Sequence, residues 1–203
     1  MVNSNGENRE FGAAFACAVA SALNENADLY TVLADVDRYG TDIVRRAFTL
    51  TLDLAEKCKD ETDFTERFYD KLLDYTYPQP KGIWKKDRYF SANGREYVPV
   101  AFALWSLCGG DINRALIAAA NFGRDCDSIA SLTGQLGGAL AGASGLREDW
   151  VREVDVANRK CLTDLYGDNT ISDMKDVAEM LAECLKESCI RNINKNNRIL
   201  SQL

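Results

Sequence analysis

Apolar residues recur three to four positions apart along nearly the whole chain of 203 residues, and strict alternation is rare. This spacing is typical of amphipathic helices rather than strands. Glycine pairs and polar turns separate the apolar stretches. We therefore predict helices over residues 10–23, 29–36, 43–55, 63–75, 97–107, 112–121, 126–145, 150–165 and 172–193. The predicted fold is all-α, a compact multi-helix bundle forming a single domain over residues 1–203, with residues 1–6 and 194–203 frayed.

Composition adds little to this picture but excludes some partners. The chain is 46% hydrophobic and 27% charged, as in ordinary globular domains. Its net charge of −7 argues against nucleic acid as a partner, because phosphate binding needs a basic surface. The N-terminus lacks the layout of a signal peptide, and the one long uncharged run, residues 128–146, is too polar for a membrane helix. We expect a cytoplasmic protein without a membrane partner.

The residue types present also restrict the chemistry. The chain has seven cysteines, an odd number, with no Cys-x-x-Cys pair, which indicates reduced intracellular thiols. It has no histidine, so a Ser-His-Asp triad and His-ligated zinc are excluded. Catalysis would have to use carboxylates, hydroxyls, thiols, Lys, Arg, Tyr or a metal held by oxygen atoms.

The segment over residues 77–94 breaks the helical pattern. It contains two of the three prolines and brings lysines and arginines together with aromatic residues such as Trp84 and Tyr89. The plainer interpretation is a solvated loop whose aromatic side chains cover the edge of the core. The alternative is a lid in which Trp84 and Tyr89 bind substrate by stacking on a base or sugar, while the basic side chains neutralise phosphate.

Asp125, Asp127 and Ser128 place three hard oxygen ligands within four residues, at the start of a long uncharged helix. Such oxygens can hold a hard cation. Residues two apart point to different sides of a regular helix, so the aspartates converge only if Gly123, Arg124 and Asp125 are irregular. The alternative is that Asp125 caps the helix by bonding the Ser128 amide, with Asp127 favoured by the helix dipole.

Glycines in the following helix favour the metal interpretation. Gly134, Gly138 and Gly142 recur every four residues, with Gly137 and Gly145 beside them. Each glycine inside a helix costs about 1 kcal/mol relative to alanine. This predicts a stripe of close helix packing and a rigid support behind the polar cluster.

The residues over 121–150 closely resemble the signature of the ADP-ribosylglycohydrolase family, which includes dinitrogenase-reductase-activating glycohydrolases and crystallin J1-like proteins. Family members show Gly-x-Asp-x-Asp-[Thr/Ser]-Ile-Ala followed by a Gly/Ala helix, matched here from Gly123 onward. An upstream Glu-x-Val-Pro motif is matched by residues 96–99, and a downstream tryptophan by Trp150. The clear resemblance covers residues 96–150, and a fainter one extends toward residue 11.

The resemblance implies an all-α fold with two magnesium ions in a cleft, and hydrolysis of the glycosidic bond that joins ADP-ribose to an acceptor. Asp125, Asp127 and Ser128 would be metal ligands, Asp125 and Asp127 would take part in catalysis, and Gly123 and Arg124 would lie against substrate. The family's N-terminal Gly-Asp-Ala-x-Gly and Thr/Ser-Asp-Asp-Thr motifs are absent, so the chain resembles the C-terminal two-thirds of a member. It would hold at most one Mg²⁺ well.

Three hypotheses therefore stay open. The chain is a magnesium-dependent ADP-ribosyl hydrolase acting as a fragment or subunit, a non-catalytic module that binds ADP-ribose or metal in the manner of crystallin J1-like relatives, or a helical bundle whose aspartates only cap a helix. We also expect a homo-oligomer, or a partner chain that covers the surface left by the absent N-terminal helices.

Overall fold

The structure is a computed structural model that describes residues 6–72, 75, 93–167, 171 and 173–202. In this part of the chain every regular element is helical, so the predicted all-α class is confirmed. The described helices are α1 (Asn8–Ala22), α2 (Leu29–Tyr39), α3 (Asp42–Ala55), α4 (Glu61–Lys71), α6 (Gly94–Leu107), α7 (Ile112–Asn121), α8 (Cys126–Ala141), the 3-10 turn η2 (Ala143–Gly145), α9 (Glu148–Tyr166) and α10 (Met174–Leu200).

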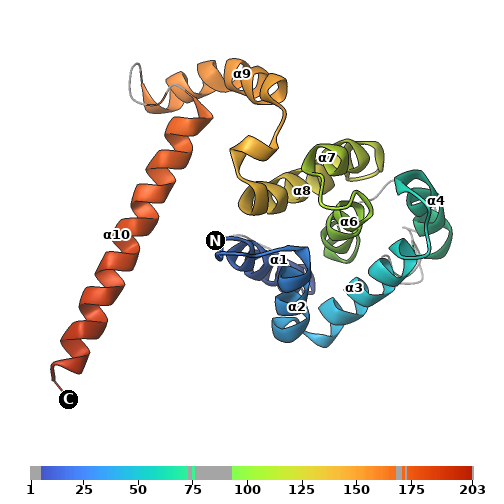
Figure 1. The fold of residues 1–203 in the computed structure, drawn as a ribbon, viewed down its shortest axis with the longest axis horizontal. Helices are drawn as coiled ribbons and strands as arrows, with labels where there is room; N and C mark the ends of the chain where they lie inside the picture. The colour runs from blue at the N-terminus through green and yellow to red at the C-terminus, as the bar shows by residue number, and fades with distance from the viewer. Residues whose placement is uncertain (1–5, 73–74, 76–92, 168–170, 172, 203) are drawn as a thin grey trace. The chain divides into compact units, whose positions relative to one another are not determined.

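The chain groups into two compact units, Met1–Leu146 and Arg147–Leu203. The boundary between the units falls just after η2, and the single domain over residues 1–203 stays a prediction. The first unit contains α1 to α8, and the second contains α9 and α10 (Figure 1). Each unit is described below by itself.

Helix α6 is the centre of the first unit. It contacts α1, α3, α7 and α8, and every residue from Val98 to Trp105 is buried. Phe102 lies edge-on to Phe15 of α1 and to Phe48 of α3, with ring centroids 6.5 and 5.1 Å apart. A helix that is apolar on all sides must be enclosed by others, and the sequence of α6 dictates that position.

Aspartates start several helices by a shared mechanism. The side chains of four of them each accept a hydrogen bond from a backbone amide in the first helical turn, which satisfies donors that have no partner inside the helix. These residues are Asp28, Asp60, Asp111 and Asp173.

Several helix boundaries differ from the predicted ones, and two of the differences have a clear local cause. The Gly-rich helix α8 ends at Ala141 rather than at residue 145, because Gly142 takes a φ of +67°, outside the helical region. Residues 194–200 continue α10 to Leu200, past the predicted helix end at residue 193. No glycine or proline interrupts this stretch, and its leucine, isoleucine, lysine and arginine side chains are compatible with a helix.

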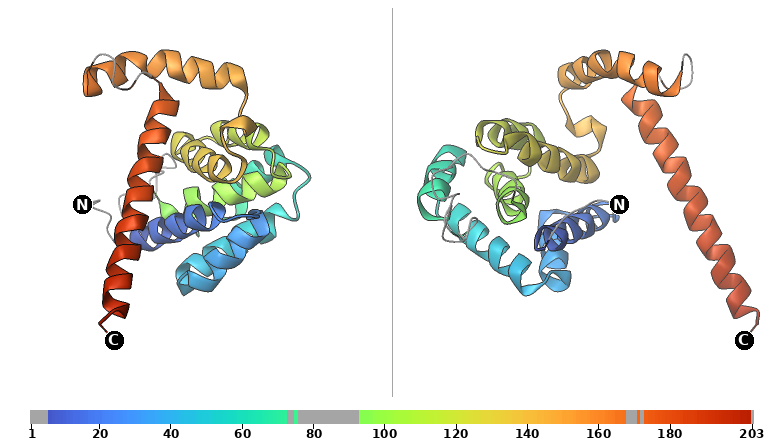
Figure 2. Two further views of the ribbon diagram at one scale, coloured as in Figure 1. Left: turned by 60° about the vertical axis from the view of Figure 1, so that its left-hand side comes forward. Right: turned by 180° about the vertical axis from the view of Figure 1, so that it is seen from behind.

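The second unit buries little of its own surface. In α9 the only described buried residue is Leu162, and α10 has none among its 27 residues. The backbone amide of Met174 donates to Asp155 over 3.1 Å and ties the start of α10 to α9. Figure 2 shows α10 as one continuous helix. None of the described helices is long and apolar enough to cross a membrane.

Candidate functional site

The loop between α7 and α8 is held in an irregular conformation. Phe122 is buried, and its ring contacts those of Phe64, Phe68 and Tyr69 from α4. The Tyr69 hydroxyl donates to the Phe122 carbonyl. Gly123 and Arg124 then take positive φ angles of +83° and +54°, and α8 begins at Cys126. The backbone before α8 is therefore irregular, as it must be if Asp125 and Asp127 are to converge.

A buried ion pair fixes this loop to the central helix. The Arg124 Nε donates to Glu96 Oε1 over 2.8 Å, and the exposed fractions of the two side chains are 8% and 0%. Glu96 lies in the first turn of α6. Because the bond joins residues 28 positions apart, it positions the start of α8 directly against the core.

Asp125 and Asp127 lie side by side at the start of α8. Their carboxyl groups are within hydrogen-bonding reach of each other, and the Ser128 hydroxyl also bonds Asp125. Burial raises the pKa of Asp125, and the negative charge of Asp127 raises it further, against the opposing effects of Ser128 and Arg124. Two carboxylates held this close repel each other unless a proton or a cation lies between them.

Asp125 does not act as a helix cap. Its side chain accepts no capping hydrogen bond from the first turn of α8. Four other aspartates that start helices do accept such bonds, as described above. The capping hypothesis for Asp125 is therefore wrong, and its carboxylate is directed to Ser128 and Asp127 instead.

A cleft of about 370 Å³ opens beside these residues. It is lined by Asp127, Ser128 and Ser131 on one helix face, together with Leu132, and by Tyr97 from α6. Burial raises the pKa of the Tyr97 phenol, with a smaller contribution from the negative charge of Asp125. The protonated hydroxyl of Tyr97 therefore stands beside the aspartates as a hydrogen-bond donor at neutral pH.

The four residues that the sequence predicted to bind substrate lie in different surroundings. A Cβ on Gly123 would lie 2.8 Å from the Tyr69 hydroxyl oxygen, so this glycine permits a close approach within the protein. Arg124 is buried against Glu96 rather than directed to solvent. Trp84 and Tyr89, with the proposed basic lid, lie outside the described residues.

Sequence reasoning missed two residues of the site. Glu96 entered only through its family motif, and Tyr97 was used only to mark a helix start. A signal for Glu96 was present, since a lone carboxylate next to a long apolar run has to be paired when it is buried. No local pattern indicated that Arg124 would be its partner.

The glycines of α8 produce close packing at Gly137, which the sequence placed beside the predicted stripe. A Cβ on Gly137 would lie 2.4 Å from Ile112 Cδ1, so α7 and α8 approach closely there. A Cβ on Gly138 would meet nothing within 4 Å, and Gly142 ends the helix. The predicted stripe through Gly134, Gly138 and Gly142 was therefore wrong beyond Gly134, whose Cβ would contact Leu116 at 3.4 Å.

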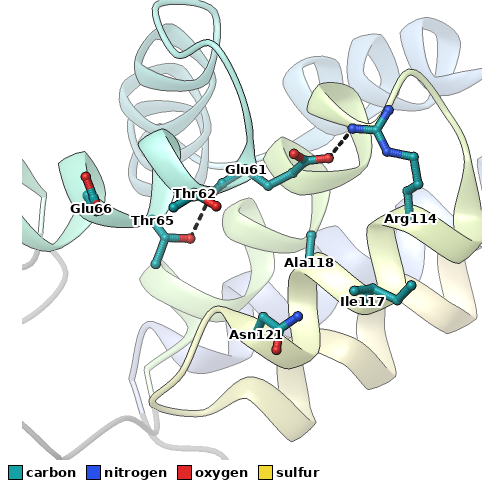
Figure 3. A pocket seen from close by; sticks show the side chains of 8 residues that line it. All are labelled: Glu61, Thr62, Thr65, Glu66, Arg114, Ile117, Ala118 and Asn121. Carbon is teal, nitrogen blue, oxygen red and sulfur yellow. Dashed lines mark hydrogen bonds and ion pairs between the residues drawn. The ribbon is translucent and has the colours of Figure 1, made fainter.

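A second hollow of about 350 Å³ lies between α4 and α7 (Figure 3). Across it, the Glu61 carboxylate and the Arg114 guanidinium point toward each other and form an ion pair. The buried thiol of Cys108 donates to the same carboxylate oxygen over 3.1 Å. These contacts tie α4 to α7, and we assign this cluster a structural role.

The donor set at the start of α8 suits part of a site for a hard cation. Asp125, Asp127 and Ser128 offer oxygens of the type that magnesium prefers. Within the described ranges, however, no group of three or more Asp, Glu or Cys side chains is placed to hold a metal ion. A complete site would need ligands in addition to these three.

A family model described as ADP-ribosylglycohydrolase matches residues 3–186. The chain belongs to the ADP-ribosylglycohydrolase family. The match is much wider than residues 96–150, where the motifs were recognised in the sequence. It includes every helix of the first unit and reaches into α10 of the second.

Two curated proteins resemble short stretches of the chain. An ADP-ribosylarginine hydrolase Tri1 from Pseudomonas putida (strain GB-1) is 43% identical over 53 residues, which are 26% of this chain and 14% of the relative. An ADP-ribosylarginine hydrolase Tri1 from Serratia proteamaculans (strain 568) is 42% identical over 50 residues, 24% of this chain and 14% of the relative. The matched stretches thus span about one-seventh of these relatives. No solved structure matches the chain.

Proposed function

We propose that the chain hydrolyses the glycosidic bond of ADP-ribosylated substrates with the help of Mg²⁺, and that Asp125, Asp127 and Ser128 form one part of the active site. The observation that carries this proposal is the convergence of the three side chains beside a cleft. Family membership supports the reaction class. The names of the two relatives support an arginine linkage as the bond that is cleaved.

The proposed reaction adds water across the bond to the anomeric carbon. The water oxygen bonds to that carbon, the bond to the acceptor nitrogen breaks, and a proton from the water ends on the leaving nitrogen. Asp125 and Asp127 would orient the attacking water and the ribose hydroxyls by accepting hydrogen bonds, and Tyr97 would donate one at the cleft wall. Mg²⁺ held by Asp125, Asp127 and Ser128 would supply charge stabilisation.

Additional ligands would come from outside the described residues or from a partner chain. This follows from the number of ligands, because two carboxylates and a hydroxyl leave several coordination positions of a magnesium ion to be filled by water. The chain would therefore be active as a fragment or subunit, and efficient only when the site is completed.

The test is release of ADP-ribose from an ADP-ribosylated arginine peptide, with and without Mg²⁺. We expect metal-dependent release that Asp127→Ala reduces by at least about a hundredfold, because it removes a group on the reacting atoms. Asp53→Ala is the control, since Asp53 is an exposed residue of α3. The proposal would be contradicted if no ADP-ribose were released. It would also be contradicted if the rate of release were the same without Mg²⁺ and in Asp127→Ala.

The second candidate is a non-catalytic module that binds ADP-ribose or metal. One observation favours this function: among the described residues, no three acidic or thiol side chains are placed to hold a metal ion together. Calorimetry with ADP-ribose distinguishes the two functions. Heat of binding without any turnover would support the non-catalytic function. Measurable turnover would contradict it.

A further inference from the structure

Two side chains at the start of α1 bond to the start of α6. Asn8 Oδ1 accepts a hydrogen bond from the backbone amide of Gly94 over 2.9 Å, across 86 positions of the sequence. Glu7 is the residue before α1, and its side chain makes no capping bond to that helix. Its carboxylate instead accepts hydrogen bonds from Arg95 Nε and Nη2, each over 2.6 Å. Residues from the beginning of the chain therefore hold the first turn of α6.

The positive charge of Arg95 makes the pair with Glu7 important for this helix start. A cation in the first turn of a helix is unfavourable, because the helix dipole is positive there. Glu7 offsets the charge, and the Arg95 side chain is only 12% exposed. The guanidinium also lies 5.4 Å from the centroid of the Tyr75 ring. Two parallel bonds to one carboxylate fix direction as well as distance, so the pair orients the first turn of α6.

Close packing makes this contact between α1 and α6 rigid. A Cβ on Gly94 would lie 2.7 Å from Phe11 Cβ, so the two helices approach closely at this point. Phe11 is fully buried. Packed interiors have few voids into which a side chain could move. The first turn of α6 can therefore shift only together with α1.

We propose that Glu7 and Asn8 are positioning residues for the cleft at the start of α8. They hold the first turn of α6, and the two residues that follow Arg95 connect that turn to the cleft. Tyr97 lines the cleft directly, and Glu96 holds the loop before α8 through its buried ion pair. Neither Glu7 nor Asn8 lines the cleft, so both act through α6. Their role in the reaction rests on the proposed function, whereas their role in placing the backbone does not.

The first experiment follows the position of the backbone without any substrate. Asn8→Ala removes the oxygen that accepts from Gly94. We expect this change to shift the amide NMR resonances of Tyr97 and of Ile129, whose amide donates to a carbonyl at the start of α8. Asp28→Ala is the matched control, because the Asp28 side chain accepts the same kind of bond in the first turn of α2. It should leave both resonances in place.

Two results of this experiment would overturn the proposal. One is an Ile129 resonance that Asn8→Ala leaves unchanged, since the contact would then fix only the end of α6. The other is an equal shift in Asn8→Ala and Asp28→Ala, which would mean that any weakened helix start disturbs α8. The melting temperature of each variant shows how far it is destabilised.

The second experiment measures release of ADP-ribose by the same variants. Asn8→Ala should lower kcat about tenfold and leave KM within about twofold, because misplaced groups slow the reaction more than they weaken binding. Asn8→Asp keeps an oxygen acceptor for Gly94 and should restore kcat to within about twofold of the wild-type value. Asp28→Ala should leave kcat unchanged. Equal losses of kcat in Asn8→Ala and Asp28→Ala, or no recovery in Asn8→Asp, would overturn the positioning role.

Charge reversal tests Glu7 by itself. Glu7→Arg places two cations together at the start of α6 and should lower kcat about tenfold. Adding Arg95→Glu restores opposite charges at the two positions and should raise kcat at least about threefold above that of Glu7→Arg. A double variant no faster than Glu7→Arg would overturn the role of Glu7.

The two experiments separate failure of the positioning role from failure of the proposed function. A wild-type chain that neither releases nor binds ADP-ribose would contradict the proposed function, and the amide resonances would then decide the positioning role alone. Shifts at both Tyr97 and Ile129 in Asn8→Ala would still support it. An unchanged Ile129 resonance would overturn it even in an active enzyme.

Discussion

Glu96 of α6 and Arg124 of the loop before α8 form a buried ion pair, with Arg124 Nε donating to Glu96 Oε1 over 2.8 Å. Arg124 takes a left-handed backbone conformation, with a φ of +54°, that a non-glycine residue seldom adopts. The bond to Glu96 stabilises that conformation. The direction of Asp125 therefore depends on a glutamate in a different helix.

Glu96→Gln should lower the free energy of unfolding by about 3–5 kcal/mol, because it leaves the Arg124 guanidinium buried without its counter-charge. Urea denaturation measures the change. The control is Asp149→Asn, which breaks the exposed ion pair with Arg147 and should cost less than about 1 kcal/mol. Equal effects of the two substitutions would contradict a special role for the buried pair.

Gly137→Ala and Gly138→Ala should change stability in opposite directions. At Gly137 the new methyl group would meet Ile112 Cδ1 at 2.4 Å, and overpacking of this kind costs about 1–3 kcal/mol. At Gly138 it would meet nothing within 4 Å, so the gain in helix propensity, up to about 1 kcal/mol, should stabilise the protein. Thermal denaturation of the two variants checks this. Stabilisation by both would show that α7 and α8 are not in close contact there.

Mg²⁺ should raise the melting temperature of the wild-type chain, since a ligand that binds only the folded state stabilises it. At a Mg²⁺ concentration ten times the dissociation constant, the gain is about 1.4 kcal/mol. Asp127→Asn should abolish this shift, whereas Asp53→Asn should keep it. A shift that survives Asp127→Asn would place the metal at another site.

Cys108→Ser should reduce the loss of stability at alkaline pH. Burial and the neighbouring Glu61 carboxylate raise the pKa of the Cys108 thiol from 9.0 to about 12. The folded state therefore keeps a proton that the unfolded state releases, and stability falls as pH rises from about 9 toward 12. One such proton amounts to about 1.4 kcal/mol per pH unit.

Serine keeps a donor for Glu61 but does not titrate in this range. The slope of unfolding free energy against pH should therefore be shallower in Cys108→Ser than in the wild type between pH 9 and about 11. Urea denaturation at a series of pH values measures both slopes. Parallel slopes would mean that the thiol titrates normally.

Local patterns predicted the helices well, because helical spacing is a property of neighbouring residues. The sequence made convergence of Asp125 and Asp127 conditional on an irregular backbone at Gly123, and that backbone is present. The pairing of Glu96 with Arg124 was not expected, since nothing near either residue in the sequence specifies the other. For the same reason the sequence could not tell which glycine of α8 makes the close contact, because Ile112 in another helix places it at Gly137.

The anchoring of Arg124 to a fully enclosed helix has a consequence for motion. Loops that carry binding residues often open by local fluctuation, with little cost to the rest of the fold. Here the loop cannot swing outward without drawing a buried carboxylate from the first turn of α6. Amide hydrogens around Cys126 should therefore exchange with solvent nearly as slowly as those of α6, and substitutions deep in that helix should be able to alter the cleft without touching it.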